Sequence, residues 1–464
     1  MRYLVKLWSM VFLCMVSVQA FAQNDSKANP ATVKTIGLKD AIEAATQYAP
    51  QLDISEQELA LRQAQHGRAT AGMILPQLEV DILTGVVPDL PEGFGPANDF
   101  PDYNANLKEL GPFIRSKLTF VQPVFLFNRL NNLKKAARNG VLSAEQGLKA
   151  KQNEVIEQVQ TVYWTHVYLQ NIKDFVAELL DRANQAKDRV QERLDSGSGE
   201  VTDIDLMRIK VFINETQRRA AEAQRGLDIA EYSLKMLMGL NSEQKITIQD
   251  SQLPKPTLNL QSSEHYMARA KVARPEIQQL EKAVLAQKHL TLSKRAEFFP
   301  NIFIAGQWEL SDAPGRATFS NPYINDGFNR NIFGASFGIR QNLSFHNIAA
   351  EYKEEKVKLK LAQSRTNLAL QAIELDIRDK YLNLKAKREA YDSSTQALKS
   401  ARSWVLSSTL NFGAGLMDAR ELLESFVGYA SVKANFYEVL YNYHKAYFAL
   451  RRAIGEDIRV EKNN

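Results

Sequence analysis

Cysteine is almost absent from this sequence of 464 residues, and its only cysteine is Cys14. Cys14 falls in an apolar run from Leu7 to Val18 that follows Arg2 and Lys6 and precedes Ala20-Phe21-Ala22. A basic start, an apolar run and small residues before the cut are the three parts of a cleavable export signal. The run is shorter than the ~20 residues of an uncleaved membrane anchor. We therefore expect a cleaved signal at residues 1–22 and an exported chain without disulfides.

Long apolar runs and an excess of one charge are also missing. No stretch after the signal approaches the length and apolarity of a membrane-spanning helix. The formal net charge of +5 falls to +3 when Arg2 and Lys6 leave, because residues 1–22 contain no acid. A chain of this length with so balanced a charge is not expected to bind nucleic acid.

Motifs for catalysis are missing as well. His66, His166, His289 and His444 have no partner at the spacing of metal ligands. The sequence contains no nucleophile elbow, phosphate loop or dinucleotide fingerprint. We therefore expect no enzyme activity, no catalytic residue, no cofactor and no metal site.

Proline is absent from residues 124–253 and 323–464, although 15 prolines occur elsewhere. Because proline breaks helix interiors, these two stretches favour long helices. A helix from Asn128 to Leu194 would extend roughly 100 Å at 1.5 Å per residue. A compact globule does not need such a length, whereas a conduit across the periplasm does.

The two halves of the chain resemble each other. Four short segments recur in the same order, with an offset that shrinks from 225 to 216 residues, and the pairs are Ala49-Pro50 with Arg274-Pro275, Leu75-Pro76 with Phe299-Pro300, Val121-Gln122 with Arg340-Gln341, and Gly197-Ser198-Gly199 with Gly413-Ala414-Gly415. Duplication is the simplest explanation. We predict a first repeat at 35–240, a linker at 241–260 and a second repeat at 261–456.

Each repeat is predicted to run helix, strand, loop, strand, long helix, tight turn, long helix. The four expected strands are 77–87, 113–125, 301–310 and 331–345. Ile302, Ile304, Trp308 and Leu310 alternate with polar residues, as in a strand with one apolar face. Ten-residue strands fit a tilted crossing of a membrane barrel, although an ordinary half-buried sheet would show the same alternation.

Heptad spacing marks the long helices. Leu148, Val155, Val162, Leu169 and Val176 recur every seven residues, as do Leu361, Leu368, Leu375 and Leu382. The return helices carry the alternating spacing of a packed seam, in Ala220, Ala223, Leu227, Ala230, Leu234 and Leu237 and in Val432, Phe436, Val439, Tyr443, Ala446 and Leu450. We predict two antiparallel coiled-coil hairpins.

Four strands cannot close a membrane barrel, because single barrels need about eight and open edges are not tolerated in lipid. Several copies must therefore share one barrel. Two copies would supply eight strands and three would supply twelve, and the strand count alone does not choose between them.

The chain resembles the TolC-like outer-membrane factors over roughly 35–455. The resemblance rests on Leu38-Lys39-Asp40-Ala41-Ile42 before Ala49-Pro50, Leu75-Pro76-Gln77-Leu78, Gln122-Pro123-Val124-Phe125 and the turn from Gly199 to Leu206. It implies a mainly α fold with a membrane β part. Long helical hairpins would form an α-barrel tunnel, and four strands per chain would enter a trimeric twelve-stranded barrel in the outer membrane.

The resemblance also implies function and partners. A homotrimer would be the outer-membrane channel of a tripartite efflux pump or a type I secretion system, working with a periplasmic adaptor and an inner-membrane transporter. The cargo would be drugs, metals or secreted proteins. The alternative is a periplasmic coiled-coil adaptor, which usually carries one hairpin, whereas this chain has two hairpins and two strand pairs.

The hairpin turns are the candidate functional sites. Glycine permits the left-handed backbone of a tight turn, and the docking candidates are Gly197, Gly199, Gly413, Gly415 and Leu416. The candidates for a ring of carboxylates around the aperture are Asp203, Asp205, Asp418 and Glu421. Acids in the first turn of a helix also stabilise that helix through its dipole, which explains them without an aperture.

Among the aromatic residues, we expect Tyr163, Trp164 and Trp404 in the core and Phe120, Trp308 and Phe337 facing lipid.

Overall fold

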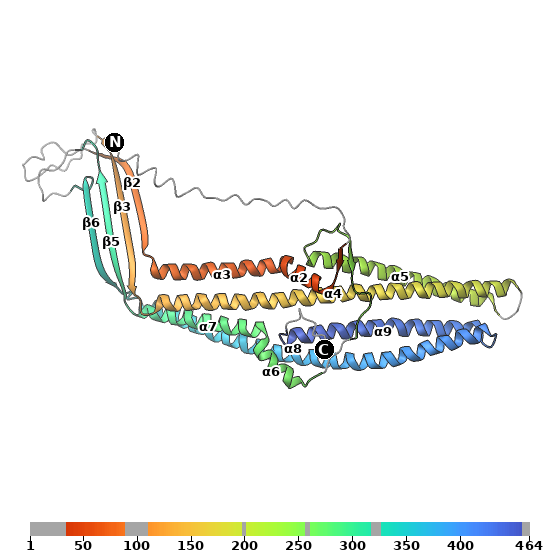
Figure 1. Cartoon of the computed structure of the whole chain (residues 1–464). Helices are drawn as coiled ribbons and strands as arrows, with labels where there is room; N and C mark the ends of the chain where they lie inside the picture. The colour runs from red at the N-terminus through yellow and green to blue at the C-terminus, as the bar shows by residue number, and fades with distance from the viewer. Residues whose placement is uncertain (1–33, 89–109, 197–200, 256–259, 317–325, 457–464) are drawn as a thin grey trace, which may run out of the picture.

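The chain is long and narrow, with a sheet at one end and the ends of two helix pairs at the other (Figure 1). The computed structural model describes residues 34–88, 110–196, 201–255, 260–316 and 326–456. The expected signal, Gly197 and Gly199 lie outside the described residues. Among the described helices, none combines the length and the apolarity that crossing a membrane requires.

Four antiparallel strands form the sheet, in the order β2-β3-β5-β6. They are β2 (Gln77–Pro88), β3 (Leu110–Phe125), β5 (Asn301–Asp312) and β6 (Arg330–Arg340). The last strand was expected to reach residue 345 and this was wrong, because it ends at Arg340. The Ser344 backbone N–H donates to Asn342 Oδ1 at 3.0 Å, and this turn directs the chain into the next helix.

One face of the sheet is apolar and open to the surroundings. Val80 pairs with Leu118, Leu118 with Trp308 and Trp308 with Phe333, so the four side chains form one row. Trp308 is 47% exposed and Phe333 is 71% exposed. The next row, which points to the other face, contains Asp81, Lys117 and Glu309. The predicted alternation of apolar and polar residues is therefore confirmed.

Helices continue each strand away from the sheet. In the half near the sheet lie α3 (Pro50–Ile74), α4 (Arg129–Asp195), α7 (Pro275–Arg295) and α8 (Phe345–Gly413). Their contacts give the order α3-α4-α7-α8, which repeats the strand order above them. Pro50 and Pro275 each occupy the first helical position, where a missing N–H costs nothing. The proline-free stretches contain the two longest helices, α4 and α8, of 67 and 69 residues.

In the half far from the sheet, α4 pairs with α5 (Asp203–Leu237) and α8 pairs with α9 (Ala419–Ala453). The order there is α5-α4-α9-α8 (Figure 1). Ala223, Leu227, Ala230 and Leu234 are buried in the α5 seam as predicted. The two predicted hairpins are therefore present.

The predicted seam of α8 was wrong. Leu361, Leu368, Leu375 and Leu382 are 46%, 67%, 69% and 55% exposed. The buried heptad positions of α8 are two residues further along, at Ile377, Leu384, Tyr391, Val405 and Phe412. Trp404 was also misassigned to the core, since it is 48% exposed beside Gly428 of α9. Helix α8 thus has two heptad rows, and α9 covers only one.

A small core at the middle of the molecule holds the repeats together. It contains α2 (Leu38–Tyr48), α6 (Ser263–Ala273) and the parallel pair β1 (Lys34–Ile36) and β4 (Ile246–Ile248). The Tyr163 hydroxyl of α4 donates to Asp250 Oδ2 at 2.5 Å. Trp164 stacks on His444 of α9, with ring centroids 5.4 Å apart. Tyr163 and Trp164 are therefore core residues, as predicted.

Candidate functional site: the hairpin tip and the polar sheet face

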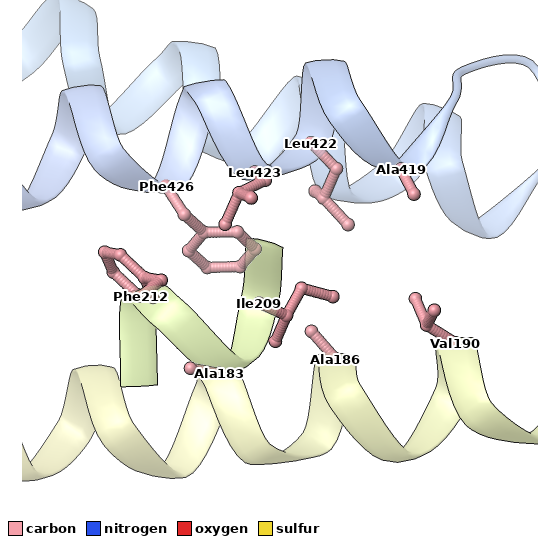
Figure 2. Close-up of a pocket in the computed structure, with 9 residues that line it drawn as sticks. All are labelled: Ala183, Ala186, Val190, Ile209, Phe212, Ala419, Leu422, Leu423 and Phe426. Atoms are coloured by element: carbon pink, nitrogen blue, oxygen red, sulfur yellow. The ribbon is translucent and has the colours of Figure 1, made fainter. Parts of the chain in front are cut away.

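The two hairpins meet near their turns through apolar side chains. Val190 of α4, Ile209 of α5 and Leu422 of α9 belong to one buried cluster. Figure 2 shows these side chains converging from the three helices on a small apolar pocket. This apolar contact holds the ends of the two hairpins side by side at the end of the molecule opposite the sheet.

Asp205 is held by the start of α5. Thr202 caps this helix, and its hydroxyl accepts a hydrogen bond from the Asp205 backbone N–H while the Asp205 carboxylate accepts from the Thr202 N–H. Arg208 also donates to Asp205, at 3.2 Å. These bonds form a capping box, which stabilises the first turn of the helix. The helix-stabilising role considered for Asp205 is therefore visible in its contacts.

The second turn is built around Gly415 and Asp418. Gly415 has a φ of +73°, in the left-handed region that glycine tolerates. Asp418 is the N-cap of α9, and its carboxylate accepts from the Glu421 N–H at 2.7 Å. Gly413 ends α8, and Leu416 projects into the surroundings with 79% of its area exposed.

Asp203 and Glu421 differ from the capping acids. Both side chains lie in the first turn of their helix and are exposed. The structure therefore brings all four candidate acids to one end of the molecule, but Asp205 and Asp418 are occupied by backbone N–H groups. Asp203 and Glu421 are therefore the two candidate acids that do not cap their helix.

A link that the sequence did not reveal joins the hairpins above the tip. Lys433 of α9 donates to Glu178 of α4 at 3.1 Å, and its ammonium lies 4.3 Å from the centre of the Phe175 ring. Burial is the largest single effect on Lys433 and disfavours its charged form, but Glu178 and Tyr429 together outweigh burial and raise the pKa of Lys433. At Glu178 burial is also the largest single effect, but Lys433 and Arg182 together outweigh it and lower the pKa of that carboxyl. Both groups are therefore charged at neutral pH.

The polar face of the sheet carries its own ion pairs. Glu309 of β5 is 5% exposed and lies between two arginines, 3.4 Å from Arg115 Nε and 2.5 Å from Arg330 Nη2. These ion pairs connect β3, β5 and β6 on one face of the sheet, while the opposite face is apolar. A sheet with these two faces suits a boundary between lipid and a water-filled channel. Among the described residues, no group of acids, histidines or cysteines has the geometry of a metal site.

Comparison with known proteins settles the family. A model of the family described as outer membrane efflux protein matches residues 115–240 and 267–456. The chain belongs to this family. The two matched segments each end beyond a helical hairpin, so the match includes both turns. No curated protein sequence matches the chain significantly.

Solved structures share the fold of this efflux protein. The outer-membrane channel OprN aligns with a TM-score of 0.74 and 14% identity, covering 91% of each chain. CusC aligns with a TM-score of 0.72 and 16% identity, covering 93% of this chain and 96% of its own. The open state of the MtrE outer membrane channel of Neisseria gonorrhoeae aligns with a TM-score of 0.69 and 16% identity, covering 94% of each chain.

Family membership establishes the general role of this efflux protein. It is an outer-membrane channel component of an efflux system, and it extends from the outer membrane into the periplasm. The alternative of a periplasmic adaptor is not favoured, because the matching family is that of the outer-membrane component.

Proposed function

We propose that three copies of this chain assemble into one exit duct across the outer membrane and the periplasm. Each copy would contribute four strands to a twelve-stranded barrel and four helices to the tunnel below it. The observation that carries this proposal is a four-stranded sheet with one exposed apolar face, whose edge strands β2 and β6 have no further partner strand among the described residues. In lipid, such edges must be paired.

The duct would work with a periplasmic adaptor and an inner-membrane transporter that supplies the energy. Its cargo would be drugs, metals or secreted proteins. The support is the length of the helices, because the 67 residues of α4 extend roughly 100 Å from the sheet. The hairpin turns would then lie deep in the periplasm, within reach of a partner in the inner membrane.

The tip would serve as both aperture and docking site. Asp203, Asp205, Asp418 and Glu421 of three copies would surround the opening, and the exposed carboxylates of Asp203 and Glu421 would favour cations. Gly413, Gly415 and Leu416 would meet the adaptor, together with the turn at Gly197 and Gly199. The exposed Leu416 supports this, because it offers an apolar contact beside a tight turn.

The test combines native mass spectrometry with single-channel recording in planar bilayers. A trimer that gives discrete openings is expected. Replacing Asp203 and Glu421 together with alanine should then reduce the preference for cations. A chain that stays monomeric and never inserts would contradict the proposal.

A further inference from the structure

The exposed leucines of α8 form a regular surface that none of the described helices of the same chain covers. Leu361, Leu368, Leu375 and Leu382 are spaced by seven residues, the period that keeps side chains on one side of a supercoiled helix. Helix α9 packs against a different row of α8. That row lies two residues further along each heptad and contains Ile377 and Leu384. A second packed row on one helix calls for a second partner helix.

The opposite edge of the molecule carries matching rows. The helix order runs from α3 and α5 on one edge to α8 on the other. On α3, Leu61 and Ile54 are seven residues apart and are 57% and 64% exposed. On α5, Met236 and Ile229 are also seven residues apart, and both are 55% exposed. Both edges therefore present an apolar heptad row.

The rows lie at equal depths below the sheet. Helices α4 and α8 both begin at the sheet end, so equal residue counts from Arg129 and Phe345 mean equal depths. Gly226 of α5 lies against Leu169 of α4, which is 40 residues beyond Arg129. Because α5 runs back toward the sheet, Met236 lies at the depth of Leu375.

Counting in the same way places the other pairs. Ile229 of α5 lies at the depth of Leu382. For α3, Ser55 and Glu58 line one cavity with Gly147 and Lys151 of α4. This places Leu61 near the depth of Leu361 and Ile54 near the depth of Leu368, each within about one helical turn.

We propose that the leucine row of α8 packs against the apolar rows of α3 and α5 in an adjacent copy of this chain. The contacts are Leu361 with Leu61, Leu368 with Ile54, Leu375 with Met236 and Leu382 with Ile229. This assignment rests on the proposed trimer, and it names the residues that close the helical tunnel. The strand edges support the second copy as the occupant, because β6 and β2 lie on the same two edges as α8 and α3.

Disulfide or maleimide cross-linking tests which residues of α8 lie beside which residues of the adjacent copy. The mature chain is expected to lack cysteine, so only the introduced cysteines would react. The matched pair carries Leu375→Cys and Met236→Cys. The control carries Leu375→Cys and Val211→Cys, because Val211 is an equally open apolar residue of α5, at 69% exposure, but lies roughly 38 Å closer to the tip. After mild oxidation or a short bis-maleimide, the matched pair should give a ladder of covalent dimer and trimer. The control should remain monomeric on a denaturing gel.

Other outcomes separate this assignment from the proposed function. A chain that native mass spectrometry shows to be trimeric, but whose matched pair does not link, would overturn the assignment and leave the trimer intact. Equal linking in the control, or a link to a protein of different mass, would also overturn it. A chain that is monomeric even without cysteines would overturn the proposed function as well.

Discussion

Some single residues connect the two repeats through contacts that one repeat by itself could not make, and His444 is an example. His444 of α9 lies between Trp164 of α4 and Phe448, and its Nε2–H donates to the Pro254 carbonyl. Burial lowers the pKa of His444 to about 4, and the bond to Pro254 only partly opposes this. The imidazole is therefore neutral inside a core that connects α4, α9 and the segment between the repeats.

Acid should weaken this core through His444. The unfolded chain takes up the proton near pH 6.5, whereas the folded chain resists it until about pH 4, so stability is fully present above pH 6.5 and falls between pH 6.5 and 4. The loss would be at most about 3 kcal/mol. The melting temperature of His444→Gln, followed by circular dichroism in detergent, should depend less on pH over this range than that of the original chain. Equal slopes would contradict the assignment to His444.

The Lys433–Glu178 link should contribute a modest coupling between hairpins. Glu178 is 42% exposed at its side chain, so solvent screens the pair and we expect a coupling of at most about 1 kcal/mol. Lys433→Met keeps the aliphatic stem and removes the charge. A double-mutant cycle with Glu178→Gln in thermal unfolding measures the coupling, and additive effects would show that the pair contributes nothing.

Elements show where the sequence was informative and where it was not. Heptads and missing prolines predicted the long hairpins, because each row repeats over many turns. On α8, however, Leu375 and Ile377 belong to two different apolar rows with the same heptad spacing. The row of Ile377 packs within the chain and the row of Leu375 is proposed to pack on another copy, and the sequence pattern does not distinguish the two. Strands β1 and β4 were missed because three residues are too few for a periodic pattern. At the tip, the spacing of acids after each turn predicted the positions of Asp205 and Asp418, but not their bonds to backbone N–H groups.

The N-cap of α9 allows the helix-stabilising and aperture roles of Asp418 to be separated. Asp418→Ala removes the acceptor for the Glu421 N–H and should cost about 1 kcal/mol, whereas Asp418→Asn keeps an acceptor and should cost much less. Both variants remove the same charge. If Asp418 acts at the aperture, the two should change the cation preference of the channel equally while their melting temperatures differ. Unchanged selectivity in both would leave only the capping role.

The whole molecule is organised around a sheet with two different faces. Phe337 is 66% exposed and shares its face with Ile304, Trp308 and Phe333. The neighbouring Ser336 points to the opposite face, beside Ala305. In the proposed barrel, the apolar side of the sheet would meet lipid and the other side would meet the channel water. Adjacent residues of one strand would then lie in different surroundings.

Arginine at these two neighbouring positions should have opposite consequences. Phe337→Arg places a charge toward lipid, which costs about 2–4 kcal/mol near the middle of the bilayer, and should reduce the amount of protein recovered in outer-membrane fractions. Ser336→Arg places the same charge in the channel and should leave that amount near normal. A larger loss for Ser336→Arg than for Phe337→Arg would mean that the faces are assigned the wrong way round, and equal losses would mean that the two faces do not differ in this way.

The unpaired edges β2 and β6 have a consequence for how the cell makes this protein. In the proposed trimer, a solitary chain would leave these edges without partners in the bilayer, so insertion would have to wait for encounters between copies. The rate of channel formation should therefore rise more steeply than in proportion to the number of exported chains. Halving expression would then remove well over half of the working channels at early times, and a small increase in synthesis would have a disproportionate effect on export capacity.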